Sequence, residues 1–397
     1  MAADGAGATM SETIETFDGE VSGTPPLSDE ILSDVPPRRG VALLAAADGS
    51  AIQLLTAADM RARVRNRIHA PDEQTRRNMP DLGKVTSRVA WKLASGHFET
   101  DLYFFELARR YWPDEYPGML AFKPAWFVHV DPEAEVPRFE RTRRPEETHG
   151  RRFGPFPSGK SAQRFCDIIR DGFYLCRDVR MLRKAPQGQP CAYGQMDRCL
   201  GACCGRISMA EYRRVVAEAA DFAVGRRGGH IEQLRRRMRE ASESLLFERA
   251  AAYKARLERL SELEEPDFQH VAPLDEFRFV LVQPYTGRKA KVFFADCEKV
   301  TPAEVLTYPP DEGKLREMLD RAQQRMTSAA CEDEPARWRM GLLCRYLFSS
   351  PRRKGLILRL RDNLEAAELA GAIRDSSDVL GLKPPPPKRD KGNTSHR

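Results

Sequence analysis

Four cysteines near the middle of the chain have the residue type and the spacing to bind a metal. They are Cys176, Cys191, Cys199 and Cys203, in the pattern C-x14-C-x7-C-x3-C. Soft, multiply charged metal centres need several thiolates that converge on one point. The spacing is compatible with structural zinc or an iron–sulfur cluster, and unligated thiols in a compact loop are the alternative. Cys204 competes with Cys203 as the last ligand.

The composition indicates a folded protein that stays in the cytoplasm. Hydrophobic residues make up 41% of the 397 residues, which is enough to form the cores of two or three domains. No run of eighteen apolar residues exists, so no membrane span is expected. The N-terminus lacks the basic and apolar regions of a secretory signal. In the reducing cytoplasm, the nine cysteines are interpreted as metal ligands or buried thiols rather than disulfides.

Charge is distributed unevenly along the chain. Residues 1–37 hold eight acidic residues and no Lys or Arg, whereas residues 38–397 hold all 64 basic residues and 50 acidic ones. Fifty of the basic residues are arginines, whose guanidinium group can donate two parallel hydrogen bonds to phosphate. The net charge of +14 over residues 38–397 therefore favours a polyanionic partner, most simply DNA. A GC-rich genome, whose codons favour arginine, is the alternative explanation.

Both ends of the chain are predicted to be disordered. Residues 1–37 form an acidic segment that is poor in aromatic residues, and residues 384–397 form a basic tail that starts with four prolines. Between them, an α/β unit is predicted over residues 38–150. Its expected elements are two strands around an Asp48-Gly49 turn, helices over 57–68, 85–94 and 99–111, and strands over 126–130 and 138–142.

Three further modules are predicted after residue 150. In residues 151–229, a Gly/Pro elbow at 153–158 precedes a helix over 160–171, and a capping box at Ser208 and Glu211 starts a helix that ends near Val224. Residues 230–264 are predicted to be a helical hairpin. Residues 265–383 are predicted to be a small α/β module with strands over 277–282 and 290–295 and helices over 311–327, 333–348 and 363–375.

Residues 150–205 resemble the segment that follows the nuclease domain in UvrC-type excinuclease subunits. The resemblance rests on Phe153-Gly154-Pro155-Phe156, on the R-C-L-x-x-C box from Arg198 to Cys203, and on Gly205-x-Ile207-Ser208. It implies a [4Fe–4S] cluster on the four cysteines of the spacing pattern, with zinc as the alternative. Residues 151–229 are then a helical cysteine-cluster module.

Residues 230–263 resemble the UVR motif, the helical hairpin through which UvrB and UvrC bind each other. The matching pieces are Leu246-Phe247-Glu248 and Ala250-Ala251, and two apolar stripes at helical spacing run from Ile231 to Leu245 and from Phe247 to Leu260. The resemblance implies a docking surface for a UvrB-like helicase, with self-association or an ordinary internal hairpin as alternatives. Lys254-Ala255 stands where the family usually has Arg-Asp. The predicted partner-binding residues are Leu246, Phe247, Ala250 and Tyr253.

Residues 38–150 resemble a degenerate GIY-YIG nuclease domain, a fold that brings two Tyr, an Arg and a metal-binding Glu to one sheet face. Here Gly40-Val41-Ala42 and Gln53-Leu54-Leu55 replace the two tyrosine motifs. Arg63 matches the catalytic arginine, and Phe104 stands at the position of the glutamate. An Mg²⁺ or Mn²⁺ site would therefore need Glu99 or Glu106. The predicted DNA-binding residues are Arg61, Arg63 and Arg65.

The fold class predicted from these modules is α+β with several domains, and three functions are compatible with them. The first is a UvrC-like nucleotide-excision-repair protein that binds DNA and docks a UvrB-type partner without GIY-YIG nuclease activity; the missing tyrosines favour it. The second is a divalent-metal-dependent, structure-specific DNA endonuclease with a rewired active site. The third is a redox sensor built on the metal cluster.

Overall fold

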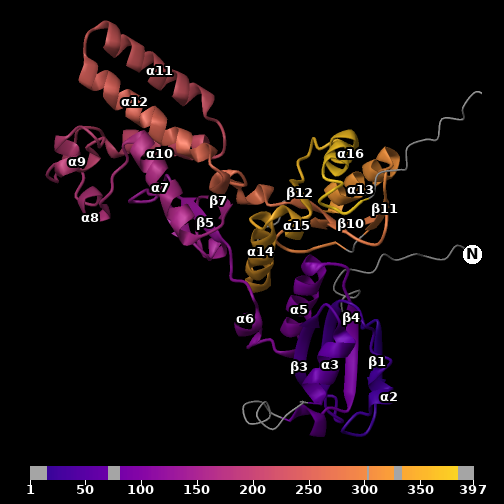
Figure 1. Ribbon diagram of the computed structural model, residues 1–397. Helices are drawn as coiled ribbons and strands as arrows, with labels where there is room; N and C mark the ends of the chain where they lie inside the picture. Colours follow the sequence, from indigo (N-terminus) through magenta and orange to yellow (C-terminus); the bar gives the residue numbers. More distant parts are fainter. Residues whose placement is uncertain (1–15, 70–80, 302–303, 326–332, 383–397) are drawn as a thin grey trace, which may run out of the picture.

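The computed structural model describes residues 16–69, 81–301, 304–325 and 333–382, and within them it combines three four-stranded sheets with helices (Figure 1). The predicted mixture of helices and sheets is confirmed. In these ranges no helix has both the length and the apolar character that a membrane span requires. The predicted tail over residues 384–397 lies outside the described residues.

The first sheet has the antiparallel order β1-β4-β2-β3. The Asp48-Gly49 turn joins β2 to β3 as predicted, with Gly49 at a φ of 84°. The helix predicted over 85–94 is wrong, because this segment forms β4. Its residues Val89, Ala90 and Trp91 are buried between neighbouring strands, and this pairing outweighs the local helical pattern. The strands are β1 (Gly19–Ser22), β2 (Gly40–Ala45), β3 (Ala51–Ala57) and β4 (Arg88–Leu93).

The disorder predicted for residues 1–37 is wrong for residues 16–37. β1 pairs with β4, and a short helix, α2 (Asp29–Leu32), follows it. Leu27, Leu32 and Val35 are fully buried against the sheet and α3 (Met60–Ile68). Two of the acidic residues that suggested disorder, Glu20 and Asp29, form ion pairs with Arg88 and Arg65. Residues 1–15 lie outside the described residues.

The second sheet crosses two predicted domain boundaries. Its order is β6-β5-β7-β8, so strands from both sides of residue 150 and of residue 265 pair with each other. The predicted Gly/Pro elbow at 153–158 is largely strand β7. Two helices, α7 (Gly159–Phe173) and α10 (Met209–Ala223), pack on this sheet. Its strands are β5 (Trp126–Val130), β6 (Glu140–Thr142), β7 (Arg151–Phe156) and β8 (Ala272–Pro273).

The third sheet has the antiparallel order β11-β10-β9-β12. One face of this sheet packs on α13 and α16, as expected for a small α/β module. The strands are β9 (Phe279–Pro284), β10 (Lys289–Ala295), β11 (Glu304–Thr307) and β12 (Leu356–Arg359). The helices are α13 (Glu312–Arg325), α14 (Glu334–Leu347), α15 (Pro351–Lys354) and α16 (Ala366–Asp375).

The first and third sheets share a layer of helices between them. α5 (His97–Tyr111) and α14 contribute to one core with both sheets, whereas α3 covers the opposite face of the first sheet. Phe98 of α5 packs edge-on against Phe293 of β10 and Tyr346 of α14, with ring centroids 5.3 Å apart in both pairs. The predicted separate module over 265–383 is therefore part of a larger unit that includes residues 16–120.

A helical hairpin and a cysteine-rich loop complete the middle of the chain. α11 (Gly228–Glu243) and α12 (Phe247–Ser261) run antiparallel and project from the rest of the molecule (Figure 1). The loop between α7 and α10 contains α8 (Val179–Leu182), α9 (Ala192–Gln195) and the 3-10 helix η3 (Ala202–Cys204). The remaining short elements are α6 (Tyr116–Met119), η1 (Leu82–Lys84), η2 (Pro145–Glu147), η4 (Glu262–Glu264), η5 (Pro266–Phe268) and η6 (Leu274–Glu276).

The prediction that no cysteine forms a disulfide is wrong for Cys297, which is disulfide-bonded. The other seven cysteines of the described residues are free thiols. They include the four predicted metal ligands.

Candidate functional site

The hairpin base, formed by Arg256, Arg259, Leu260 and Glu262, is fixed on α7. Leu260 is buried against Gly172, and a Cβ atom at Gly172 would lie 2.3 Å from Leu260 Cδ2. Only glycine therefore lets the two helices approach this closely. The guanidinium of Arg256 donates to the carbonyl of Gly172 at 3.1 and 2.5 Å.

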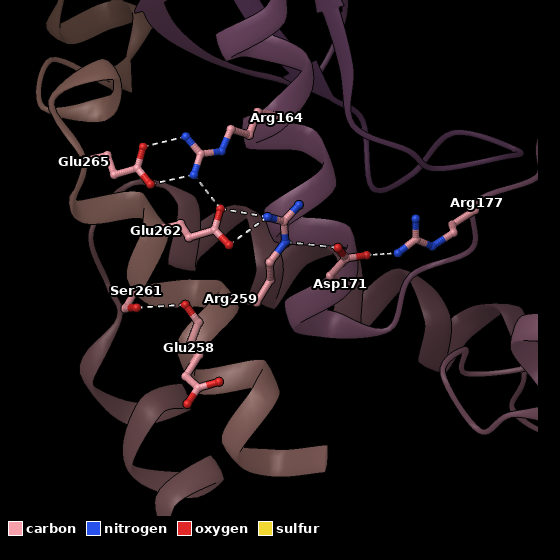
Figure 2. A network of polar contacts seen from close by, with 8 residues as sticks. All are labelled: Arg164, Asp171, Arg177, Glu258, Arg259, Ser261, Glu262 and Glu265. Carbon is pink, nitrogen blue, oxygen red and sulfur yellow. Dashed lines mark hydrogen bonds and ion pairs between the residues drawn. The ribbon is translucent and has the colours of Figure 1, made fainter. Parts of the chain in front are cut away.

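Ion pairs surround this contact (Figure 2). Arg164 of α7 lies 2.7 Å from Glu262, and Arg259 bridges Glu262 at 2.7 Å and Asp171 of α7 at 3.1 Å. Burial raises the pKa of Glu262, but hydrogen bonds from Arg259 and Arg164 outweigh this effect and lower it below its usual value. The other members of the network are Arg177 and Glu265. The base is thus held by apolar burial and by charge together.

The hairpin tip, Leu245, Leu246 and Phe247, is the opposite end of the same hairpin. The relative exposures of these residues are 71%, 45% and 65%. The predicted partner-binding residues Leu246 and Phe247 therefore lie together on the surface. Ala250 is half-buried one turn away, whereas Tyr253 packs against the core of the middle unit and is further from the tip.

Leu245 was predicted to lie on the inward apolar stripe, and this prediction is wrong. Its φ of 57° places it in the left-handed region just after α11, where glycine is usual. The Leu245 and Leu246 amides donate to the carbonyls of Ser242 and Ala241, which closes the turn. The signal that could have revealed Leu245 is three consecutive large apolar residues at a helix–helix turn, where loops are usually polar.

The predicted metal ligands lie in one loop module. The thiols of Cys176 and Cys199 interact with each other, and Cys203 interacts electrostatically with Cys199 and Cys191. The Cys176 thiol donates to the carbonyl of Asp178 at 3.3 Å, and Cys199 Sγ accepts from the Gly201 amide at 3.4 Å. Cys203 is buried and also contacts the neighbouring thiol of Cys204. In the part of the chain that the structure describes, no three Cys, His, Asp or Glu side chains are grouped as they would be around a metal ion.

The contact between Cys176 and Cys199 separates the acidities of the two thiols. The hydrogen bond from Cys176 lowers the pKa of Cys199, and the same bond together with burial raises the pKa of Cys176. Stabilised thiolates are the form of cysteine that binds metals. Of the two, only the Cys199 thiol is thus shifted toward the thiolate, whereas burial raises the pKa of Cys203 as well as that of Cys176.

The three predicted DNA-binding arginines of α3 have different surroundings. Arg61 donates to the carbonyl of Val35 at 2.8 Å, and Arg65 donates to the carbonyl of Asp29 at 3.0 Å and lies 3.3 Å from its carboxylate. These two side chains thus anchor the N-terminal segment. Arg63 is exposed, and no carboxylate of the described residues forms an ion pair with it.

Glu99 and Glu106, the two candidate metal ligands of a rewired nuclease, both form ion pairs with the C-terminal part of the chain. Glu99 is 1% exposed; its Oε1 lies 2.5 Å from Lys291 Nζ and its Oε2 accepts from the Ser95 amide at 2.6 Å. Glu106 lies 3.1 Å from Arg339 and 2.9 Å from Arg109. Protein cations thus already neutralise both carboxylates.

Two family models match the middle of the chain. The model of the UvrC/Cho excinuclease middle domain matches residues 125–222, and that of the UvrB/uvrC motif matches residues 230–263. The resemblance to UvrC-type excinuclease subunits is confirmed. Residues 125–263, here named the UvrC-type segment, include the second sheet except β8, the cysteine loop and the hairpin. Neither model reaches residues 38–124, where the GIY-YIG resemblance stays a prediction.

Curated relatives extend the similarity to about 60% of the chain. The UvrABC system protein C of Syntrophus aciditrophicus is 29% identical over 236 residues, which are 58% of this chain and 37% of the relative. The protein of the same name from Moorella thermoacetica is 26% identical over 242 residues, or 60% and 38% of the two chains. The match therefore spans less than half the length of these relatives. No solved structure matches the chain.

Proposed function

We propose that this protein is a UvrC-like nucleotide-excision-repair protein that binds DNA and docks a UvrB-type partner through its hairpin, without GIY-YIG nuclease activity. The hairpin tip carries this proposal. Three consecutive apolar side chains are exposed there, at a site where the family's UVR motif matches. Exposed apolar groups in water are unfavourable, so a cluster of them on a fixed support is typical of an interaction surface.

The hairpin base supports docking because it limits the freedom of the tip. Leu260, Arg259 and Glu262 hold α12 on α7, so the tip is presented with little loss of conformational entropy on binding. An amphipathic helical element that places apolar anchors in a partner's groove is a common recognition mode. Phe247 is the largest such anchor at the tip.

The docking proposal is tested by titrating a UvrB-type protein with the full chain in a calorimeter. We expect Phe247→Ala to weaken binding by about 2 kcal/mol, or about 30-fold in Kd, as for a buried aromatic anchor. Val85→Ala is the matched control, because Val85 is also an exposed apolar residue but lies far along the chain in another unit. Light scattering tests self-association. Equal binding by wild type and Phe247→Ala, with no wild-type dimer, would refute docking through the tip.

DNA binding is supported by the charge of +14 over residues 38–397. Arg61 is bonded to the carbonyl of Val35 and Arg65 to Asp29, so of the predicted trio only the Arg63 side chain has no such contact within the described residues. Binding would then depend on many dispersed cations. If five or six phosphates are contacted, affinity should fall about 10²–10³-fold between 50 and 200 mM salt. Salt-independent binding would instead favour codon bias as the source of the arginines.

The absence of nuclease activity is supported by the ion pairs of Glu99 and Glu106. A divalent metal would have to compete with Lys291 and Arg339 for these carboxylates. The alternative, a metal-dependent structure-specific endonuclease, predicts cleavage of bubble DNA with Mg²⁺ or Mn²⁺. We expect no cleavage by wild type and none by Lys291→Ala, which frees Glu99. Metal-dependent cleavage that is lost in Glu99→Gln would establish the endonuclease.

We propose further that Cys176, Cys191, Cys199 and Cys203 hold a [4Fe–4S] cluster, with zinc as the alternative. Their common loop and the Cys176–Cys199 contact support this. Anaerobically purified protein should contain about four irons per chain, and Cys199→Ala should lose them. Stoichiometric zinc without iron would replace the cluster by a structural zinc site. A cluster that is reversibly oxidised with a change in DNA binding would favour the redox-sensor function.

A further inference from the structure

A cavity of about 530 Å³ lies where the UvrC-type segment meets α14. The UvrC-type segment contributes Trp126, Arg143 and Pro157 to its wall, and α14 and the residue after it contribute Arg345 and Phe348. Lys123, which precedes the UvrC-type segment in the sequence, also lines the cavity. Because the α14 side is outside both matched family models, the cavity combines a family element with a wall that the models do not describe.

The cavity wall is positively charged. Lys123, Arg143 and Arg345 line it, and no Asp or Glu among the residues that the structure describes does so. Arg345 donates to the carbonyl of Ala121 at 2.6 Å and lies 3.5 Å from the Asp101 carboxylate, so its charge is partly neutralised. Lys123 and Arg143 have no carboxylate partner within the described ranges of the chain. Two uncompensated cations therefore face one cavity.

Arg143 is held in place by an aromatic ring. Its guanidinium carbon lies 4.5 Å from the centroid of Trp126, and Arg141 lies 5.2 Å from the same ring. Arg141 also donates to the carbonyl of Gly159 at 2.7 Å, which ties this cluster to the first turn of α7. Stacking on an aromatic face restricts a guanidinium while its N–H donors stay available, so Arg143 is prepared to bind a planar or tetrahedral oxyanion.

Much of the remaining wall is apolar. Phe348 is half-buried, and the more deeply buried Phe122 and Phe156 also line the cavity. A ligand that fits this wall has an anionic group for Lys123 and Arg143 and a flat or apolar body for Phe348. A nucleotide unit has both, because its phosphate suits arginine and its base and sugar can pack on an aromatic ring.

We infer that this cavity binds one nucleotide unit of a single DNA strand, with its phosphate between Lys123 and Arg143 and its base or sugar against Phe348. This inference rests on the proposed DNA-binding function and names the place where a strand is held. The composite wall means that the strand contacts the UvrC-type segment and α14 at the same time.

The test measures binding of the full chain to a fluorescent oligothymidylate at several salt concentrations. We expect the double variant Lys123→Ala, Arg143→Gln to bind about tenfold or more weakly and to lose about 0.7 from the slope of log affinity against log salt, since the two cations hold one phosphate and each phosphate contact on a single strand contributes about 0.7. Arg316→Gln, which removes one exposed arginine of α13, is the control for loss of positive charge away from the cavity. It should leave both quantities close to those of wild type.

A second pair of variants separates binding from folding. Pro157 is exposed at the cavity wall, so Pro157→Glu adds a carboxylate near Arg143 without removing a buried contact. It should weaken oligothymidylate binding, whereas the equally large but neutral Pro157→Gln should not. If the two Pro157 variants bind oligothymidylate equally well, or if the double variant binds as well as Arg316→Gln, the cavity is not the binding site. Binding by the wild type would still support the proposed function in that case. Failure of wild type to bind any oligonucleotide would overturn both, and displacement by polyglutamate as readily as by oligothymidylate would assign the cavity to acidic peptides instead.

Discussion

The two ends of α12 have opposite surroundings. At its C-terminal end, Leu260 is buried against Gly172, and Arg259 and Glu262 are tied into ion pairs with α7 (Figure 2). At its N-terminal end, Phe247 and its two predecessors are exposed. One helix of fifteen residues therefore combines a scaffold and an unoccupied apolar surface.

This difference separates the two uses of apolar residues. Burying a large aliphatic side chain contributes about 1.5–3 kcal/mol to folding, so Leu260 stabilises the hairpin's attachment. Phe247 contributes little to folding while it stays in water, and its gain is realised only when a partner covers it. The comparison predicts that substitutions at the base change stability and that substitutions at the tip change association.

Truncation of Leu260 should have the largest effect. Leu260→Ala leaves a cavity against Gly172, and we expect the free energy of unfolding to fall by about 2–5 kcal/mol in urea denaturation followed by circular dichroism. Leu246→Ala at the tip is the matched control and should change stability by less than about 0.5 kcal/mol. Similar losses for both leucines would remove the distinction between base and tip.

Adding a single methyl group at Gly172 tests how closely the base is packed. Gly172→Ala would place Cβ 2.3 Å from Leu260 Cδ2, and overpacking of this kind costs about 1–3 kcal/mol. The better helix propensity of alanine offsets up to about 1 kcal/mol, so we expect a net loss of up to about 2 kcal/mol. Gly371→Ala in α16 is the control, because its Cβ meets open space and should stabilise the protein. A gain in stability at both positions would mean that α12 moves easily away from α7.

Relief of backbone strain at the tip should produce the opposite sign. Leu245 has a φ of 57°, so Leu245→Gly should raise the free energy of unfolding by about 0.5–1 kcal/mol while it weakens partner binding. Ser244→Gly is the control, since its φ of −83° offers no strain to relieve. Thermal melting and the calorimetric titration measure the two effects. A destabilised Leu245→Gly would show that Leu245 is part of the hairpin's core after all.

The smallest effect concerns the pH dependence of the base. The pKa of Glu262 is lowered in the folded protein, so its contribution is fully present above the unfolded value near 4.5 and is lost as the pH falls through the lower folded pKa. The free energy of unfolding of the wild type falls between about pH 7 and about pH 3.5, and in Glu262→Gln we expect this fall to be smaller by about 0.5 kcal/mol. Glu258→Gln, an exposed position on the same helix, should leave the pH profile unchanged. Identical profiles of stability against pH for both variants would show that the ion pairs of Glu262 do not stabilise the hairpin base.

Local signals in the sequence predicted local structure well. Ser208 and Glu211 form the predicted capping box, Asp48-Gly49 forms the predicted turn, and α7, α11 and α12 follow the predicted helical patterns. In each case the deciding interactions lie within a few residues along the chain. The exposure of Phe247 and Leu246 could also be anticipated, because the UVR resemblance marked them as partner-binding.

Long-range pairing was the main source of the errors. β1 and β4 pair across about 70 residues. Composition and local propensity therefore could not reveal that residues 16–37 are folded or that residues 88–93 form a strand. The ion pairs of Glu99 with Lys291 and of Glu106 with Arg339 join positions separated by about 190 and 230 residues. Glu99 and Glu106, the candidate metal ligands, therefore connect α5 to β10 and α14 through ion pairs.

The sequence by itself determined the helical hairpin, the cysteine spacing, the excess of arginine and the UvrC-type segment, because these depend on residue types and on short, fixed separations. Only the tertiary structure decided that one sheet extends across the predicted domain boundaries at residues 150 and 265. It also decided that α5 and α14 form a shared layer of helices and that Lys123, Arg143 and Arg345 line one cavity. These outcomes depend on which apolar faces cover one another. Burial is non-directional and acts between residues far apart in the chain, so it selects partners that no local pattern specifies.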